Sequence, residues 1–291
     1  MIEVSTCVIC EQPIRCLKKA LVAPFVAERI WKKPPFCVDL VKCDACGFMF
    51  YNPRLEDEEL QREYAGWRSD EYFKMRNSFE PWYTTKFNED LGSARSYENR
   101  RALLGSSVRK HVGQRKISRI LDYGGDHGDL IKGLFDGAEL FVYDISGATP
   151  LQGVTPTKEP ASCKADLIVN SNVLEHVGFP RVLVGQILEA APKGGLVLVE
   201  VPCEFALGAS RIARRIAQVG LMSLRRPSLT PQLFRPAALY MMHEHINYFT
   251  ENSLTTLMRS CRSTVIASGA YPYSGTAGTA DMAWCLAQKP A

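Results

Sequence analysis

The sequence predicts an α/β protein in which a doubly wound, mainly parallel sheet follows a small N-terminal metal-binding module. Two pairs of closely spaced cysteines lie within the first 46 residues. An apolar segment at 117–121 runs into a glycine-rich turn, and further apolar segments alternate with helical ones as far as residue 287. Such alternation is typical of a parallel sheet that is covered by helices on both faces.

Length and composition are those of a globular protein with more than one part. The chain has 291 residues, of which 46% are apolar and 23% are charged, so a core domain with a smaller module is expected. No apolar run approaches the roughly 18 residues of a membrane span, and the first residues lack the pattern of a secretory signal. We therefore expect a cytoplasmic protein. The net charge of +4 is too small to favour a nucleic-acid partner.

Four cysteines form two CxxC pairs: Cys7, Cys10, Cys43 and Cys46. This spacing lets one turn present both sulfurs to the same ion, and four thiolates in tetrahedral array suit Zn²⁺, so a structural zinc site is expected. The 32 residues between the pairs exceed the common spacing of about 15 to 20. Ordinary free cysteines, a ligand set that includes Cys16 or Cys37, and an iron–sulfur cluster are the alternatives.

The glycine-rich turn contains both glycines and acids: Asp122, Gly124, Gly125, Asp126 and Gly128. A strand, a glycine turn and a following helix bring the backbone close to a nucleotide-like ligand. The next expected strand, 140–144, ends in Asp144, 20 residues after Gly124, where a carboxylate accepts hydrogen bonds from ribose hydroxyls. Folds that bind NAD and folds that bind S-adenosylmethionine (SAM) share this device.

Later segments separate the two cofactors. A strand at 165–171 leads into Glu175 and His176, a helix extends to Leu188, and a PKGG turn at 192–195 precedes a strand at 196–202. The acidic glycine loop, the acid of the second strand, the LEH turn and the PKGG turn, in this order, resemble class I SAM-dependent methyltransferases. The resemblance covers 117–202 and extends to 243–268. It implies a Rossmann-like sheet of seven strands, and similar enzymes with a paired-CxxC head belong to sugar and polysaccharide pathways.

The resemblance also implies a set of cofactor-binding residues, namely Asp122, Gly124, Gly125, Gly128, Asp144, Asn170 and Asn172. The loop residues would lie beneath the methionine part of SAM, the second-strand acid would hold the ribose, and the two asparagines would lie beside the cofactor. One position departs from the family pattern, because Asp126 stands where glycine is usual. Its side chain would crowd the methionyl carboxylate and weaken binding unless Gly125 takes over the tight turn.

The segment His243, Glu244 and His245 contains the expected catalytic residues. Methyl transfer is an in-line displacement, so the protein has to align the acceptor and, where needed, remove its proton. Sugar C-methyltransferases have a similar HEH segment, and by that resemblance His245 would be the base and Glu244 its partner or a substrate ligand. Those enzymes have a further C-terminal domain that we do not expect here, which disfavours C-methylation in particular, although the sequence does not determine whether O, N or C is methylated. The alternative is that these residues only tie the preceding segment to the sheet.

The segment 203–242 is rich in arginine and is expected to form a helical lid. It contains Arg211, Arg214, Arg215, Arg225, Arg226 and Arg235 against one acid, Glu204. Apolar residues recur near helical spacing at Ile212, Ile216, Val219 and Leu224, which predicts an amphipathic helix with a basic face. Such a lid suits the phosphates of a nucleotide-linked or lipid-linked sugar. Contact with an anionic membrane surface and a basic face that only meets solvent are the alternatives.

These observations predict a zinc-binding module at 1–81 and a methyltransferase domain at 82–291 that contains the lid. The expected activity is methyl transfer from SAM to a small, anionic acceptor of carbohydrate biosynthesis. Two other functions compete with it: a zinc-containing RNA methyltransferase, and a non-catalytic binding or scaffold protein with the SAM fold.

Overall fold

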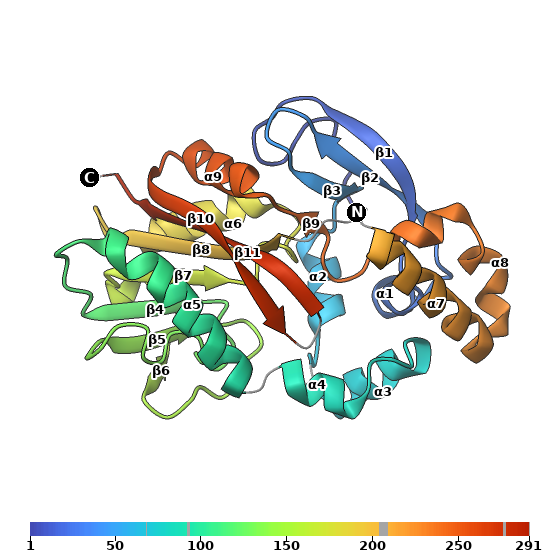
Figure 1. Cartoon of the computed structure of the whole chain (residues 1–291), viewed down its shortest axis with the longest axis horizontal. Coiled ribbons are helices and arrows are strands. Elements are labelled where there is room, and N and C mark those ends of the chain that lie inside the picture. The colour runs from blue at the N-terminus through green and yellow to red at the C-terminus, as the bar shows by residue number, and fades with distance from the viewer. Residues whose placement is uncertain (68, 92–93, 204–208, 276–277, 291) are drawn as a thin grey trace. The chain divides into compact units, whose positions relative to one another are not determined.

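The computed structural model describes residues 1–67, 69–91, 94–203, 209–275 and 278–290, with side chains outside 91–95, 209–211 and 275–280 (Figure 1). Two compact units form. The first comprises Met1–Asp90, Glu175–Gly178 and Glu204–Tyr248, and the second comprises Leu91–Leu174, Phe179–Cys203 and Phe249–Ala291. The expected boundary at residue 81 stays a prediction, while the segment expected as a lid falls almost entirely in the first unit.

The first unit is built on an antiparallel sheet of four strands in the order β1-β2-β3-β9. Their bounds are β1 Ile14–Leu21, β2 Cys37–Cys43, β3 Met49–Asn52 and β9 Asn247–Tyr248. The helices are α1 Pro24–Trp31, α2 Asp57–Tyr64, α3 Asp70–Phe79, α4 Thr85–Leu91, α7 Ala209–Arg225 and α8 Thr230–Leu233, with 3₁₀ turns η2 Pro227–Leu229 and η3 Pro236–Tyr240. The last strand, β9, comes from far along the chain and pairs with β3.

The end of the arginine-rich segment is hydrogen-bonded to the end of β1. The Ala23 amide donates to the Met242 carbonyl at 2.8 Å, and the Met242 amide donates to the Leu21 carbonyl at 2.8 Å. Backbone pairing of this kind satisfies groups that burial would otherwise leave unpaired. It explains why this segment belongs to the same unit as the N-terminal sheet.

Helix α7 confirms the expected amphipathic helix but not its expected apolar face. Val219 and Met222 are buried in the core of the first unit, whereas Ile216 is 58% exposed and Leu224 is 80% exposed. The expected stripe therefore divides between two sides of the helix. The Arg211 side chain lies outside the described residues. Within the described part of the chain, no helix is both long and apolar enough to cross a membrane.

The second unit contains a sheet of seven strands in the order β10-β11-β8-β7-β4-β5-β6. Their bounds are β4 Arg119–Tyr123, β5 Glu139–Tyr143, β6 Val154–Pro156, β7 Leu167–Ser171, β8 Leu196–Cys203, β10 Thr264–Gly275 and β11 Gly278–Gln288. The strands from β8 to β6 are parallel, and β11 pairs antiparallel with both β8 and β10. The helices are α5 Ala94–Val112, α6 Pro180–Ala190 and α9 Glu251–Ser260, with a 3₁₀ turn η1 Pro160–Cys163. This is the Rossmann-like class I methyltransferase fold, as predicted.

Parallel pairing places the predicted cofactor residues at one edge of this sheet. Asp122 pairs in register with Val142 and Val169, so Asp144 and Asn170, near the ends of these neighbouring strands, lie at the same carboxyl edge. Ligands of open α/β sheets bind at this edge, where the strand order reverses. In this sheet the order reverses at β4, between β7 and β5.

A helix was predicted directly after the glycine turn, and this prediction is wrong. Residues 129–137 form successive turns instead. Gly128 has φ 81° and Gly133 has φ 83°, and a residue in this left-handed conformation interrupts the hydrogen-bond ladder of an α-helix. The four residues between the two glycines are too few for a stable helix.

Arg54 is a fully buried guanidinium that joins three segments of the first unit. It donates to the carbonyls of Gly178 and Tyr51 at 2.8 Å each and to Asn247 Oδ1 at 2.6 Å. Burial lowers the pKa of Arg54 to about 9. A buried cation is tolerated only when its N–H donors are hydrogen-bonded. The carbonyls of Gly178 and Tyr51 and the side chain of Asn247 accept these hydrogen bonds.

We expect Arg54→Ala to lower the free energy of unfolding by roughly 3 kcal/mol or more, because several buried acceptors lose their donor at once. Chemical denaturation followed by fluorescence measures this loss. Arg62→Ala, at an exposed position of α2, is the matched control and should change stability by less than about 0.5 kcal/mol. Equal effects of the two substitutions would contradict the role of Arg54.

Candidate functional site

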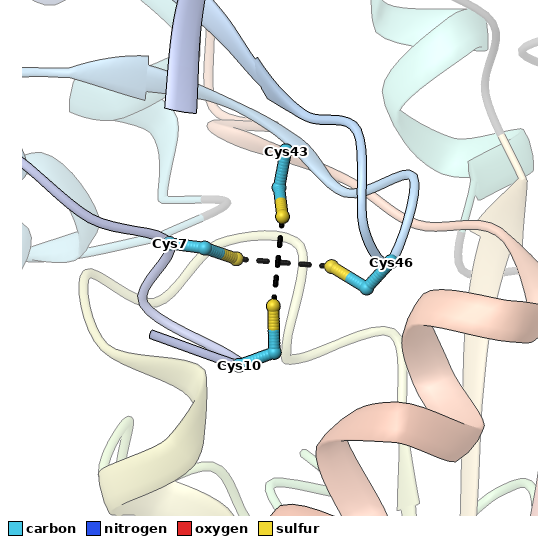
Figure 2. Close-up of side chains that lie close together, drawn as sticks. All are labelled: Cys7, Cys10, Cys43 and Cys46. Carbon is cyan, nitrogen blue, oxygen red and sulfur yellow. Dashed lines mark hydrogen bonds between the residues drawn. The ribbon is translucent and has the colours of Figure 1, made fainter. Parts of the chain in front are cut away.

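The four cysteines of the CxxC pairs come together in the first unit (Figure 2). The sulfurs of Cys7 and Cys46 are 3.8 Å apart, those of Cys10 and Cys43 are 3.5 Å apart, and all four sulfurs lie within 4.8 Å of one another. Zn–S bonds of about 2.3 Å in a tetrahedron separate the sulfurs by about 3.8 Å. The cluster has the dimensions of a four-thiolate zinc site.

Both CxxC turns have the same local geometry. The Glu11 amide donates to the Cys7 carbonyl, and the Gly47 amide donates to the Cys43 carbonyl, each at 2.9 Å. Glu11 and Gly47 have φ 62° and φ 80°, so each turn closes with a left-handed residue directly after its second cysteine. Two matching turns present four sulfurs to one point.

The other two N-terminal cysteines are not part of this cluster. Cys16 and Cys37 are both exposed, and the Cys16 thiol lies 3.5 Å from Asp39 Oδ1. Neither belongs to a group of possible metal ligands among the described residues. The geometry therefore favours the ligand set predicted from the CxxC pairs.

The glycine turn of the second unit approaches neighbouring side chains too closely for any larger residue at Gly125. A Cβ atom at this position would lie 2.1 Å from Cγ of Asp122. Gly125 is not among the residues with positive φ, whereas Asp126 has φ 54°. Asp126 is thus one of three left-handed residues in the turn, with Gly124 at φ 79° and Gly128 at φ 81°, and aspartate tolerates this conformation better than most residue types.

Asp122 and Asn170 each bury an oxygen that has no hydrogen-bond partner among the described residues. These atoms are Asp122 Oδ2 and Asn170 Oδ1. The amide nitrogen of Asn170 donates to the Tyr123 carbonyl at 2.7 Å, which fixes the side chain against β4. Burial raises the pKa of Asp122 to about 7, and the negative charges of Asp144 and Glu200 add to the effect. Two orphaned acceptors beside a glycine turn fit a ligand that brings its own positively charged donor.

Asp144 and Asn172 complete the set of expected cofactor residues. Asp144 Oδ2 accepts from the Asp126 amide at 2.8 Å and Oδ1 accepts from the Ser146 amide at 2.7 Å. The carboxylate is held in place and keeps further lone pairs for hydroxyl donors. Asn172 is exposed with φ 56°, and its amide donates to the Glu200 carbonyl at 3.0 Å.

A second buried acid, Glu200, is fully paired, in contrast to Asp122. Arg100 donates to Glu200 Oε2 from Nε at 3.0 Å and from Nη2 at 2.7 Å, and the hydroxyls of Ser171 and Tyr271 donate to the same carboxylate. The sequence analysis did not predict this cluster. The available signal was a single acid inside the apolar strand that became β8.

The HEH segment directs its first two side chains into a buried charged network of the first unit. Glu244 Oε1 accepts from the Tyr72 hydroxyl and from Arg76 Nη1, each at 2.6 Å. His243 Nε2 lies 3.0 Å from Arg215 Nη1, and its Nδ1 lies 3.3 Å from Glu80 Oε1. Burial and the nearby arginines lower the pKa of His243 well below its ordinary value. His243 is therefore neutral, with one nitrogen facing a cation and the other an anion.

His245 lies against a different group of side chains. Its ring packs edge-on to the ring of His176 with centroids 4.7 Å apart. Ligand atoms of Glu175, His176 and His245 lie within 4.8 Å of one another. His176 Nδ1 lies 2.8 Å from the Tyr64 hydroxyl and 3.0 Å from the Glu244 carbonyl. The segment Glu175–Gly178, which follows β7 in the chain, thus supplies a second imidazole beside the expected base.

Helices α2 and α3 supply charged partners that the sequence analysis missed. Tyr72, Arg76 and Glu80 recur every four residues on one side of α3 and its end, and Arg76 Nε donates to Glu80 Oε2 at 3.0 Å. Glu63 on α2 is fully buried, and its carboxyl oxygens have no partner among the described residues. Burial, with Glu244 nearby, raises the pKa of Glu63 well above its ordinary value. The four-residue spacing on α3 was the signal available in the sequence.

Comparison with known proteins agrees with this geometry. A family profile described as a methyltransferase domain matches residues 93–261, more than half of the chain. The chain belongs to this methyltransferase family. A search of curated proteins returns no match.

Solved structures share the fold of this methyltransferase at low identity. The 1,6-didemethyltoxoflavin-N1-methyltransferase of Burkholderia thailandensis, with 1,6-didemethyltoxoflavin and S-adenosylhomocysteine bound, has a TM-score of 0.50 at 15% identity and covers 88% of this chain and 96% of its own. Magnesium protoporphyrin IX methyltransferase of Synechocystis has a TM-score of 0.45 at 12% identity, covering 77% of this chain and 96% of its own. At these identities the likeness concerns the fold alone.

Proposed function

We propose that this methyltransferase transfers a methyl group from SAM to a small, anionic, sugar-related acceptor. The observation that supports SAM most directly is the buried Asp122 oxygen, which has no partner in the part of the chain that the structure describes, beside the glycine turn of a methyltransferase fold. The methionine part of SAM carries an ammonium group, which is the donor that this carboxylate requires. Asp144 would accept the ribose hydroxyls, and Gly124, Gly125 and Gly128 would let the backbone lie against the ligand.

SAM, when bound, supplies a methyl group that its sulfonium already activates. The protein then has to hold the acceptor in line and remove its proton where the acceptor is a hydroxyl or an ammonium. We assign the role of general base, which accepts this proton, to the imidazole of His245. Glu244 is already bound by Tyr72 and Arg76, and His243 faces Arg215, so these two residues orient the segment. A neutral histidine beside an arginine is a poor proton acceptor, because the cation opposes a second positive charge.

The acceptor class rests on charge and on the resemblance to enzymes of sugar pathways. The arginine-rich segment has no acid between residues 209 and 242, and guanidinium groups bind phosphate through paired hydrogen bonds. A nucleotide-linked or lipid-linked sugar combines a phosphate with hydroxyl groups that accept a methyl. O-, N- and C-methylation are equally compatible with a histidine base.

We propose a structural role for the zinc site. A closed set of four thiolates leaves no position for a substrate. Cys43 ends β2 and Cys46 precedes β3, so a bound ion would hold the β2–β3 hairpin of the first unit. Since β3 pairs with β9 directly after the HEH segment, this hairpin supports the strand that follows His245.

Native mass spectrometry of the purified protein, followed by calorimetric titration with SAM and S-adenosylhomocysteine, tests the proposed function. We expect zinc in the intact protein and binding of both ligands, and then release of S-adenosylhomocysteine with nucleotide sugars as acceptors. Failure to bind either ligand at millimolar concentration would support the scaffold alternative. RNA affinity that falls steeply with salt would support the RNA methyltransferase instead.

We expect SAM affinity to rise with pH through about 7, the pKa of Asp122 in the free protein. Below this pKa the carboxyl is neutral and no longer attracts the ammonium group, so the dissociation constant at pH 6 should exceed that at pH 8 by about tenfold. Calorimetric titrations at the two pH values measure the difference. If the affinity did not depend on pH, a residue other than Asp122 would bind the ammonium group of SAM.

Asp122→Asn separates loss of binding from loss of folding. A carboxyl whose pKa is raised on folding destabilises the folded state at every pH above its unfolded pKa, by up to roughly 4 kcal/mol above pH 7 for a rise of this size. The variant should therefore unfold at a higher temperature than the parent at pH 8 while binding SAM more weakly. Its SAM affinity should also lose the dependence on pH.

His245→Ala should lower kcat by roughly 10²- to 10⁴-fold, because the acceptor loses its general base. The affinity for SAM should not change, since the cofactor residues belong to the second unit. Steady-state release of S-adenosylhomocysteine with an acceptor from the screen measures the first effect, and calorimetry measures the second. His243→Asn, the comparison variant, should reduce stability more than turnover. A fully active His245→Ala enzyme would leave this histidine with a structural role only.

Cys43→Ser should remove zinc and lower the melting temperature by about 10 °C or more, because a structural zinc site contributes directly to folding. Elemental analysis and thermal unfolding measure these two effects. Cys37→Ser, at an exposed cysteine outside the cluster, should keep about one zinc per chain. Zinc well below this level in the parent protein would count against the site.

A further inference from the structure

Helix α7 exposes apolar side chains on the side that faces away from the core of the first unit. Ile216 is 58% exposed, Leu221 is 45% exposed and Leu224 is 80% exposed. At about 100° per residue these three side chains fall within an arc of roughly 140°, and the buried Val219 and Met222 lie outside it. Phe234, directly after α8, is 70% exposed. Single exposed apolar residues are ordinary, but four on one short segment mark a surface for contact.

Positive charge borders this apolar surface. Arg214 and Arg225 are exposed at one edge of the arc, and Arg235 is exposed directly after Phe234. The sequence contains no acid between residues 209 and 242. A helix with an exposed apolar face and flanking arginines is typical of segments that lie in the headgroup region of an anionic membrane.

A small basic cavity adjoins the C-terminal end of α7. It measures about 190 Å³, and its charged lining residues are one acid, Glu28 of α1, and three cations, namely Lys32 and Lys33, which follow α1, and Arg226, which follows α7. Arg226 is held in place, because its guanidinium stacks 4.0 Å from the Phe79 ring centroid and donates to Ser78 Oγ at 2.9 Å. Drug-sized ligands need roughly 300 Å³ or more. This cavity suits a single phosphate group.

We propose that this face of the first unit binds the surface of a bilayer that contains anionic phospholipid. The side chains of Ile216, Leu224 and Phe234 enter the boundary between headgroups and acyl chains, and the cavity of Lys32, Lys33 and Arg226 receives a lipid phosphate. A soluble phosphate ligand would leave the exposed apolar side chains without a purpose. A membrane surface matches both the apolar arc and the positive charge, and the inference does not depend on the methyl acceptor.

Flotation of the full-length protein with lipid vesicles tests this inference. We expect it to float with phosphatidylcholine vesicles that contain phosphatidylglycerol and not with pure phosphatidylcholine. Lys32→Gln combined with Lys33→Gln should weaken partitioning by about thirtyfold, at roughly 1 kcal/mol for each charge near the surface. Leu224→Ser combined with Phe234→Ser should weaken it by roughly tenfold or more. Both pairs lie on the surface, so thermal unfolding should match the parent protein.

Two control variants match these changes outside the proposed surface. Val182→Ser removes a side chain of the second unit that is 60% exposed, and Lys110→Gln combined with Lys116→Gln removes two exposed charges there. Both should partition like the parent. Equal flotation with neutral and anionic vesicles, or no flotation with either, would overturn the proposal. Unchanged flotation of the variant with Leu224→Ser and Phe234→Ser would also overturn it, by showing that these apolar side chains do not enter the bilayer.

Discussion

The two segments of the first unit that contain His176 and His245 depend on one buried cation, Arg54. Arg54 has no exposed surface and donates to the carbonyl of Tyr51 in β3 and to that of Gly178. Its acceptors include Val177 and Gly178, which follow His176, and the side chain of Asn247, which follows His245 by two residues. A guanidinium has five donors in a rigid plane, whereas a lysine ammonium has three around a single atom, so the guanidinium reaches more widely separated acceptors. Arg54, which lies outside the HEH segment, therefore holds together the two backbone segments that bring His176 and His245 close to each other.

Two buried carboxylates of the second unit, Glu200 and Asp122, differ in their hydrogen bonding. Glu200 is surrounded by donors from Arg100, Ser171 and Tyr271, and its charge is satisfied within the fold. Asp122, on β4 of the same sheet, buries an oxygen that finds no partner among the residues the structure describes, and burial raises its pKa to about 7. Leaving a buried acceptor unsatisfied costs free energy of folding. Under the proposed function, the ammonium group of SAM would supply the missing donor and offset this cost.

Asp126 shows how a departure from a family pattern is accommodated. The expectation was that either Gly125 assumes the tight turn in its place or SAM binding is weakened. Instead Asp126 adopts the left-handed conformation itself, with its amide bound to Asp144, and Gly125 is needed because its missing Cβ leaves room for Asp122. Position 126 requires a residue that tolerates a left-handed backbone, whereas position 125 requires a residue without a Cβ atom. Only the second excludes every residue other than glycine.

The sequence by itself determined the elements whose signal is local. The CxxC spacing predicted the cysteine cluster, and the glycine turn after an apolar strand predicted a nucleotide-binding edge of a parallel sheet. The seven strands and the residues Asp122, Asp144 and Asn170 followed from the resemblance to class I methyltransferases. Tertiary structure alone decided which long-range partners these groups meet. Periodicity did not reveal that Tyr72 and Arg76 bind Glu244, that the arginine-rich segment joins the N-terminal sheet, or that Ile216 and Leu224 face outward. The reason is that helical spacing limits which residues share a face, whereas the burial of that face depends on segments distant in the chain.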